Sequence, residues 1–203
     1  MDFTLRDAEV ADLPVILEIF NREIESGNGA YWGAPVDLKN REVWYFSRKE
    51  NDMPVLVVQA AGEVVGYGTY GPFRSPPLFC TSVEHSIYVK DGHRGKGYGR
   101  AMLEKLMEIG TQRGIHLMIA GIDAGNVESI NFHKKYGFEE TARMPEIAKK
   151  NGKWLTLVML QKILETLPPP RRMVERDPTL EGFPESPNGP YLVYEDEVPA
   201  LDR

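Results

Sequence analysis

The sequence contains a single cysteine, Cys80, among 203 residues. One thiol cannot form an intramolecular disulfide, and without a second cysteine it cannot build a cysteine-based metal site. The first six residues also have no signal-peptide character. These two absences predict a protein of a reducing compartment, and we expect it to be cytoplasmic.

Three other features are missing. No apolar run approaches the roughly 18 residues that a membrane-spanning helix needs. The four histidines, at positions 85, 93, 116 and 133, show neither H-x-x-x-H nor H-E-x-x-H spacing, so we expect no metal centre. A basic surplus is missing too: the net charge is −6, which argues against nucleic acid as the main partner.

Residues 166–203 differ in composition from the rest of the chain. They hold eight of the fifteen prolines, and their four arginines against eight acidic residues account for −4 of the net charge. Because such a segment has no core of its own, it is either a disordered linker or an extended segment that lies on the domain or a partner subunit through residues 191–194. We predict one domain over residues 1–165 and a proline-rich, acidic tail over 166–203.

The most informative stretch that is present runs from residue 83 to 109. It begins with a β-branched and aromatic strand, continues through a loop with three glycines in five residues, and ends in an amphipathic helix with Met102, Leu103, Leu106 and Met107 on one stripe. A glycine-rich turn at a helix N-terminus directs free N–H groups and the positive end of the helix dipole at its ligand. The pattern predicts an anion site, most often one for phosphate.

Two common phosphate motifs do not fit this loop. A P-loop needs Gly-Lys followed by Ser or Thr, and a Rossmann fingerprint needs a third glycine where Arg100 or Met102 stands. The pattern that remains is Arg94-x-x-Gly97-x-Gly99. It resembles the R/Q-x-x-G-x-G/A signature of the GCN5-related N-acetyltransferases (GNAT), in which this loop holds the pyrophosphate of acetyl-coenzyme A.

The rest of the domain alternates strands with helices. After Asp12 as N-cap we expect a helix of roughly 12–15 residues, followed by helices over 37–51 and 128–136. We expect strands over 3–6, 55–58, 64–70, 83–89, 116–122, 138–142, 145–149 and 154–160. This order predicts a mixed α/β sheet with helices on its faces.

Several separated motifs narrow the resemblance to the phosphinothricin and methionine sulfone/sulfoximine N-acetyltransferase branch of the GNAT superfamily, over about residues 3–162. They are Pro54–Val57, Gly66–Tyr67, Tyr70–Arg74, Thr81–Val89, Gly121–Asn126, Phe132–His133, Gly137–Phe138 and Gly152–Leu155. The resemblance implies the GNAT fold: a central, mixed, mostly antiparallel twisted sheet of about seven strands with helices on both faces. Relatives usually carry threonines where this chain has Gly27-Asn28-Gly29, which changes one wall of the acceptor pocket.

The resemblance also assigns residues to acetyl-CoA. The pantetheine arm would pair with the backbone of Ile87, Tyr88 and Val89. The pyrophosphate would be held by Arg94, Gly95, Lys96, Gly97, Tyr98 and Gly99, and the rest of the co-substrate would be reached by Asn126 and Lys135. A second set would line the acceptor pocket: Pro72, Phe73, Arg74, Glu84, His85 and Ser86. Arg74 would bind an amino-acid carboxylate there. Tyr31 and Trp32 form either another wall of this pocket or a cap on the core.

The chemistry points to two catalytic candidates. An amine attacks a thioester only as the free base, so a group must take its proton, directly or through a water. Glu84 fits this role if partial burial raises its pKa; otherwise it is a sheet-surface carboxylate. His133 stands four residues before Gly137-Phe138, where many family members have a tyrosine that protonates the departing thiolate. It could do the same, or it could cap the cofactor groove.

We therefore predict an acetyl-CoA-dependent N-acetyltransferase for a small amino acid-like acceptor, working by direct attack. Relatives in this branch form homodimers, which implies a homodimer here. Two alternatives stay open: an enzyme for another amine, such as a protein N-terminus or a polyamine, and a non-catalytic module that binds coenzyme A.

Overall fold

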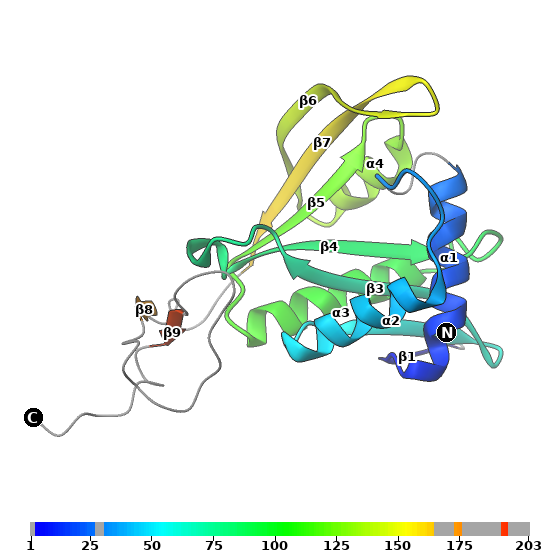
Figure 1. Ribbon diagram of the computed structural model, residues 1–203, viewed down its shortest axis with the longest axis horizontal. Coiled ribbons are helices and arrows are strands. Elements are labelled where there is room, and N and C mark those ends of the chain that lie inside the picture. The colour runs from blue at the N-terminus through cyan, green and yellow to red at the C-terminus, as the bar shows by residue number, and fades with distance from the viewer. Residues whose placement is uncertain (1–2, 27–30, 165–172, 176–191, 195–203) are drawn as a thin grey trace, which may run out of the picture.

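The computed structural model describes residues 3–26, 31–164, 173–175 and 192–194. Figure 1 shows one open sheet with the strand order β1-β2-β3-β4-β5-β7-β6. Its strands are β1 Phe3–Asp7, β2 Val55–Ala60, β3 Glu63–Pro72, β4 Ser82–Val89, β5 Leu117–Asp123, β6 Glu139–Lys150 and β7 Lys153–Ile163. The helices are α1 Leu13–Ser26, α2 Leu38–Glu50, α3 Tyr98–Gln112 and α4 Val127–Lys135.

The sheet is mixed, as predicted. β4 and β5 run parallel, and the other neighbouring strands of this sheet pair antiparallel. Parallel strands need a long crossover connection, usually a helix, and here it contains α3. The predicted fold class, a seven-stranded and mostly antiparallel sheet with helices on both faces, is confirmed.

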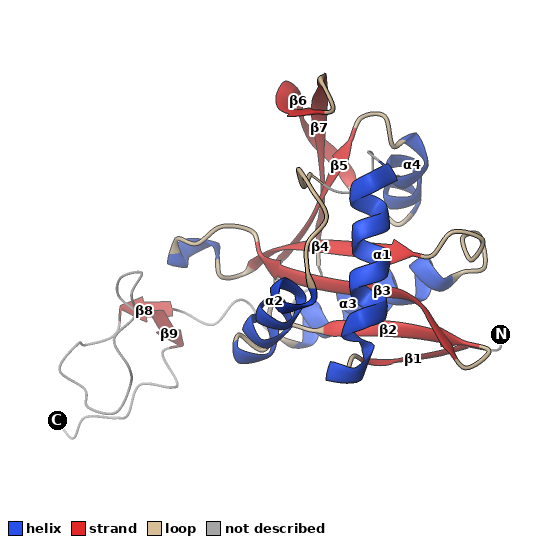
Figure 2. Ribbon diagram, turned by 45° about the vertical axis from the view of Figure 1, so that its right-hand side comes forward, coloured by secondary structure: helices blue, strands red, loops and turns tan. Residues whose placement is uncertain are grey.

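The two faces of the sheet are covered by different helices (Figure 2). On one face, α1 and α2 bury Ile16, Phe20 and Tyr45 against strand residues such as Val57 and Tyr67. On the other, α3 and α4 bury a second set against β4, β5 and β7, with Leu103, Leu106, Ile130, Val83 and Leu160 among its members. Because residues alternate in a strand, each side chain of β4 faces one helical layer or the other.

Two local predictions were wrong. Segments 138–142 and 145–149 form the single strand β6, whose register shifts between Met144 and Ala148, with Glu146 at a φ of 55°. The proline at 145 marks a bulge in this edge strand, not a turn between two strands. Asp12 is not the N-cap, because a 3₁₀ turn over Val10–Asp12, capped by Glu9, precedes α1. The Asp12 carboxylate instead accepts the Glu9 N–H at 2.8 Å.

Within the predicted tail, the described residues form two short strands. β8 Met173–Glu175 pairs antiparallel with β9 Leu192–Tyr194. The other residues of 166–203, and Gly27-Asn28-Gly29, lie outside the described residues.

Candidate active site

β4 and β5 separate in the middle of the sheet. Their parallel pairing runs from Ser82 opposite Leu117 to Glu84 opposite Ile119, and beyond this point the two strands diverge (Figure 1). On this side, no described strand pairs with residues 86–89 of β4. An extended ligand with amide groups can therefore add to this edge of β4 as a strand would.

A cavity of about 590 Å³ occupies the opening between β4 and β5. This volume is within the usual range for a small-molecule site. It is lined by most of the residues that the sequence singled out: Tyr31, His85, Ser86, Ile87, Tyr88, Val89, Arg94, Gly95, Gly97, Tyr98, Gly99, Asn126, His133 and Lys135.

The other expected site residues lie outside this lining. They are Trp32, Pro72, Phe73, Arg74, Glu84 and Lys96. Trp32 packs edge-on against Phe20 of α1, with ring centroids 5.6 Å apart. Lys96 is exposed in the loop before α3, and Arg74 is also exposed, with its guanidinium carbon 5.3 Å from the centre of the Phe73 ring.

The glycine loop has the geometry of an anion site. Gly95 and Gly97 adopt φ values of 78° and 86°, a left-handed conformation that suits glycine. Gly97 is the N-cap of α3 and has no side chain to cap it. The first N–H groups of α3 are therefore free to bind a negatively charged ligand.

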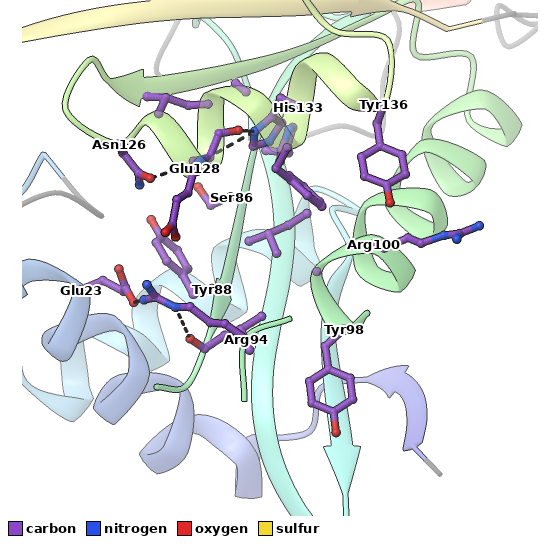
Figure 3. Close-up of a pocket in the computed structure, with 18 of the residues that line it drawn as sticks. Glu23, Ser86, Tyr88, Arg94, Tyr98, Arg100, Asn126, Glu128, His133 and Tyr136 are labelled. Carbon is purple, nitrogen blue, oxygen red and sulfur yellow. Dashed lines mark hydrogen bonds and ion pairs between the residues drawn. The ribbon is translucent and has the colours of Figure 1, made fainter. Parts of the chain in front are cut away.

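Arg94 is held at the mouth of this loop by an acidic residue that the sequence did not suggest. Its Nη2 lies 2.6 Å from Oε1 of Glu23, in α1, and Figure 3 shows the pair beside the end of β4. Burial raises the pKa of Glu23, and the charge of Arg94 opposes that rise. No local pattern marks Glu23 as a site residue, because only the tertiary fold brings α1 to this loop.

Two residues of α4 and its cap also face the cavity. Asn126 is the N-cap of α4, where its side-chain oxygen accepts the Ser129 N–H at 3.1 Å. Lys135 is the last residue of α4 and also lines the cavity. The capping role of Asn126 fixes the start of α4 against the opening between the strands.

His85 and His133 form a buried pair on the α3–α4 face, with ring centroids 5.0 Å apart. Nδ1 of His133 lies 2.7 Å from the Ser129 carbonyl oxygen, which can only accept, so Nδ1 donates and Nε2 is left as an acceptor. Nε2 of His133 and both ring nitrogens of His85 are buried without a partner among the described residues. Burial lowers the pKa of both histidines, which keeps them neutral.

Glu84 faces the opposite, α1–α2, side of β4. A Cβ placed on Gly121 of β5 would lie 2.6 Å from its Oε1, so the carboxylate rests on a glycine of the neighbouring strand. Much of the side chain is open to solvent, yet the protein around the carboxylate removes enough water to raise its pKa. His85, also expected in the acceptor pocket, faces the other helical layer, since consecutive strand residues point to opposite faces.

Asp123 at the end of β5 is a further site residue that the sequence did not single out. Its Oδ1 accepts the Gly125 N–H at 2.8 Å, while Oδ2 is buried without a described partner. Burial and the nearby Asp123 raise the pKa of Tyr31 to about 12. The available sequence signal was the Gly121–Asn126 motif, from which only Asn126 was assigned to the site.

These features fit acetyl-CoA. The free edge of β4 suits the amides of a pantetheine arm, and the glycine loop suits a pyrophosphate. The unpartnered nitrogens of His85 and His133 give the cavity wall polar atoms that a ligand can satisfy. Across the described residues, no cluster of three or more candidate metal ligands is present, and no helix is both long and apolar enough to cross a membrane.

Comparison with known proteins agrees with this geometry. Residues 16–138 match the Acetyltransferase (GNAT) family. The chain is 43% identical to the L-methionine sulfoximine/L-methionine sulfone acetyltransferase of Pseudomonas aeruginosa strain PAO1, over 81% of this chain and 96% of that protein.

Two solved structures extend the likeness. A phosphinothricin acetyltransferase from Sinorhizobium meliloti, in complex with acetyl-CoA, is 34% identical with a TM-score of 0.79, over 82% of this chain and 91% of the other. A ribosomal-protein-alanine N-acetyltransferase from Brucella melitensis is 43% identical with a TM-score of 0.78, over 79% of this chain and 99% of the other. With the sheet opened between β4 and β5 and the glycine loop leading into α3, this chain belongs to the GNAT acetyltransferase family.

Proposed function

We propose that this acetyltransferase acts on the α-amino group of small amino acid-like acceptors, the class that includes methionine sulfoximine, methionine sulfone and phosphinothricin. The observation that carries the proposal is the arrangement of β4. Glu84 projects to the α1–α2 face where β4 and β5 separate, while residues 86–89 line the cavity. An acceptor on one face can thus meet a thioester that enters from the other.

In the cofactor half of the site, several of the proposed roles belong to backbone groups. The edge of β4 at Ile87, Tyr88 and Val89 would pair with the pantetheine arm, and N–H groups near Val89 would stabilise the oxyanion as the amine attacks. The loop from Arg94 to Gly99 would bind the pyrophosphate. Arg94 would exchange part of its interaction with Glu23 for phosphate oxygens, and Asn126 and Lys135 would reach the remainder.

Glu84 would take the proton from the attacking amine, directly or through a water. Burial raises the pKa of Glu84, which makes it a better proton acceptor than an ordinary carboxylate. The pocket beside it would be lined by Ser86, Tyr31 and Trp32 and by the loop Pro72-Phe73-Arg74. Arg74 would have to leave the Phe73 ring to bind the acceptor carboxylate.

For His133 the geometry favours lining the groove over acting as an acid. A neutral imidazole whose Nδ1 donates to Ser129 presents only a lone pair at Nε2. It can accept a hydrogen bond from an amide or thiol of the co-substrate. To protonate a departing thiolate it would first have to gain a proton, which burial opposes.

The test is acetyl-CoA turnover, followed as free thiol, with methionine sulfone, methionine sulfoximine and phosphinothricin as acceptors. We expect turnover with all three. Cofactor binding without turnover of any of them would remove this acceptor class.

A peptide with an N-terminal alanine belongs in the same assay. The relative from Brucella melitensis is named as a ribosomal-protein-alanine N-acetyltransferase, which favours a protein N-terminus as the second candidate acceptor. A kcat/KM for the peptide above that for every amino acid would support that candidate instead.

We further propose that the protein is a cytoplasmic homodimer. The β6–β7 hairpin projects from the domain (Figure 1), and Ile147 and Trp154 on it are 54% and 57% exposed. A second copy would cover these apolar side chains. Light scattering should give a dimer for the full chain and a smaller species for Ile147→Asp; a monomeric wild type would contradict the proposal.

A further inference from the structure

Helix α2 directs two arginines, Arg41 and Arg48, at the face of the sheet that carries Glu84. They are seven residues apart, about two helical turns, so they share one face of the helix. Figure 2 shows α2 on the same side of the sheet as α1. Among the ion pairs of the described residues, none involves either guanidinium.

Arg41 is enclosed by the protein itself. It is only 4% exposed, its guanidinium carbon lies 4.1 Å from the centre of the Phe20 ring, and it bonds to the Asn40 side-chain oxygen at 2.6 Å. These contacts leave it no room for a ligand. Its charge acts instead on Arg48, because two cations on one helix face repel each other.

Arg48 is open to a partner. Its guanidinium lies flat on Gly71 of β3, where a Cβ would come within 2.5 Å of Cζ. Its Nε is buried, and its side chain has no hydrogen-bond partner among the described residues. Burial, and then the charge of Arg41, lower the pKa of Arg48. A desolvated and unpaired guanidinium is costly in a fold, and a bound anion or oxygen group would remove that cost.

The position of Arg48 relative to Glu84 follows from the strand register. Gly71 pairs with Glu84, so both face the α1–α2 layer, and Glu84 leans away from Arg48 over Gly121 on β5. Adjacent strands are about 4.8 Å apart, which separates the carboxylate and the guanidinium by roughly 10 Å across the sheet. An extended acceptor with an amine at one end and oxygens at the other fits this spacing.

We infer that Arg48 binds the oxygen-bearing group at the far end of the acceptor side chain. The inference rests on the proposed function, which places the amine at Glu84. The acceptor carboxylate sits on the same carbon as the amine and lies close to it, whereas the sulfone, sulfoximine or phosphinate oxygens are several bonds away. The planar fork of arginine donates to two such oxygens at once.

The experiment compares two acceptors that differ only in these oxygens, methionine sulfone and methionine. In the wild type we expect sulfone to be the better substrate by kcat/KM. Arg48→Met should raise KM for the sulfone at least about tenfold and leave KM for acetyl-CoA unchanged. The kcat/KM values of the variant for the two acceptors should then be similar. Lys49→Met, which removes a neighbouring exposed charge from the same helix, is the matched control. It should change neither the KM for the sulfone nor the ratio of the kcat/KM values for the two acceptors.

Gly71→Ala is the second variant, because it displaces the guanidinium without removing it. It should lose discrimination as Arg48→Met does, and melting temperatures of both variants check folding. If discrimination is absent in the wild type or survives in a folded Arg48→Met, the inference is wrong and the proposed function stands. If the wild type acetylates neither amino acid, the proposed function fails, and this inference with it.

Discussion

Glu84 and His85 are neighbours in the chain, and their side chains face opposite sides of the sheet. Glu84 faces the α1–α2 layer, and His85 packs against His133 and Phe138 under α3 and α4. Because neighbouring residues of a strand point to opposite faces, the proposed proton acceptor and the wall of the proposed cofactor cavity lie on opposite sides of β4. This arrangement lets each be altered without the other, which makes residue-level tests informative.

Replacing the carboxylate of Glu84 tests its role as a base. Glu84→Gln should lower kcat/KM by about 10²–10⁴-fold and leave acetyl-CoA affinity unchanged. Since the base works when ionised and its pKa is raised, wild-type activity should rise with pH through a value above 4.5, the ordinary pKa of glutamate. The variant should lack this limb in a pH–rate profile.

The matched control for this substitution is Glu63→Gln, at the exposed start of β3. It should retain wild-type activity and the wild-type profile. If Glu84→Gln behaves in the same way, Glu84 is a surface carboxylate.

The buried histidines make stability depend on pH. The folded pKa of His85 lies well below its ordinary value of 6.5, so the unfolded chain binds the proton first as the pH falls. Stability is therefore full above about pH 6.5 and declines below it, by at most about 1.4 kcal/mol per histidine for each pH unit. Denaturant unfolding at pH 7.5 and 5.5 should show the loss.

His85→Gln removes this titration and should reduce the difference between the two pH values. His116→Gln, at an exposed position, should leave it intact. An equal pH dependence in all three proteins would mean that other groups cause it.

At the scale of elements, the glycine loop and α3 could be predicted from sequence because their signals are local. Three glycines and an apolar stripe at helical spacing specify a turn and the buried face of a helix, whatever surrounds them. Met102, Leu103 and Leu106 are indeed buried. The strand before the loop was equally clear, since its residues favour a pleated surface.

The loop geometry can be tested by adding one methyl group. Gly97→Ala and Gly92→Ala both place a side chain at a left-handed φ, of 86° and 75°, and each should cost about 1–2 kcal/mol of stability. Only Gly97 lines the cavity and caps α3. Gly97→Ala alone should therefore raise KM for acetyl-CoA, by about tenfold, while both lower the unfolding midpoint; equal KM values would separate the loop from cofactor binding.

What could not be predicted depends on contacts between distant segments. Glu23 meets Arg94 across 71 positions, and Arg48 meets Gly71 because α2 crosses the sheet there. No local pattern carries such pairings. The continuity of β6 was missed for the opposite reason: Pro145 is a strong local breaker, and the partner strand β7 overrides it by pairing on both sides of the bulge.

At the scale of the whole molecule, Leu164, just after the end of β7, belongs to the buried core of the described domain. Leu164 is 4% exposed, and its N–H donates to the His116 carbonyl oxygen at 2.8 Å. A chain ending at residue 165 should keep wild-type stability and activity. A chain ending at 163 should lose about 2–5 kcal/mol, as for loss of a buried leucine, when both are unfolded in denaturant. Equal stability of the two chains would contradict this boundary.

The separation of β4 from β5 also affects how long the protein survives. Three parallel residue pairs join the two halves of the sheet, and the proposed acetyl-CoA site occupies the opening beside them. A ligand that binds the folded state alone adds stability in proportion to the logarithm of its concentration, about 2.7 kcal/mol at 100 times its Kd. The supply of acetyl-CoA would then set the lifetime of the enzyme against proteolysis as well as its rate.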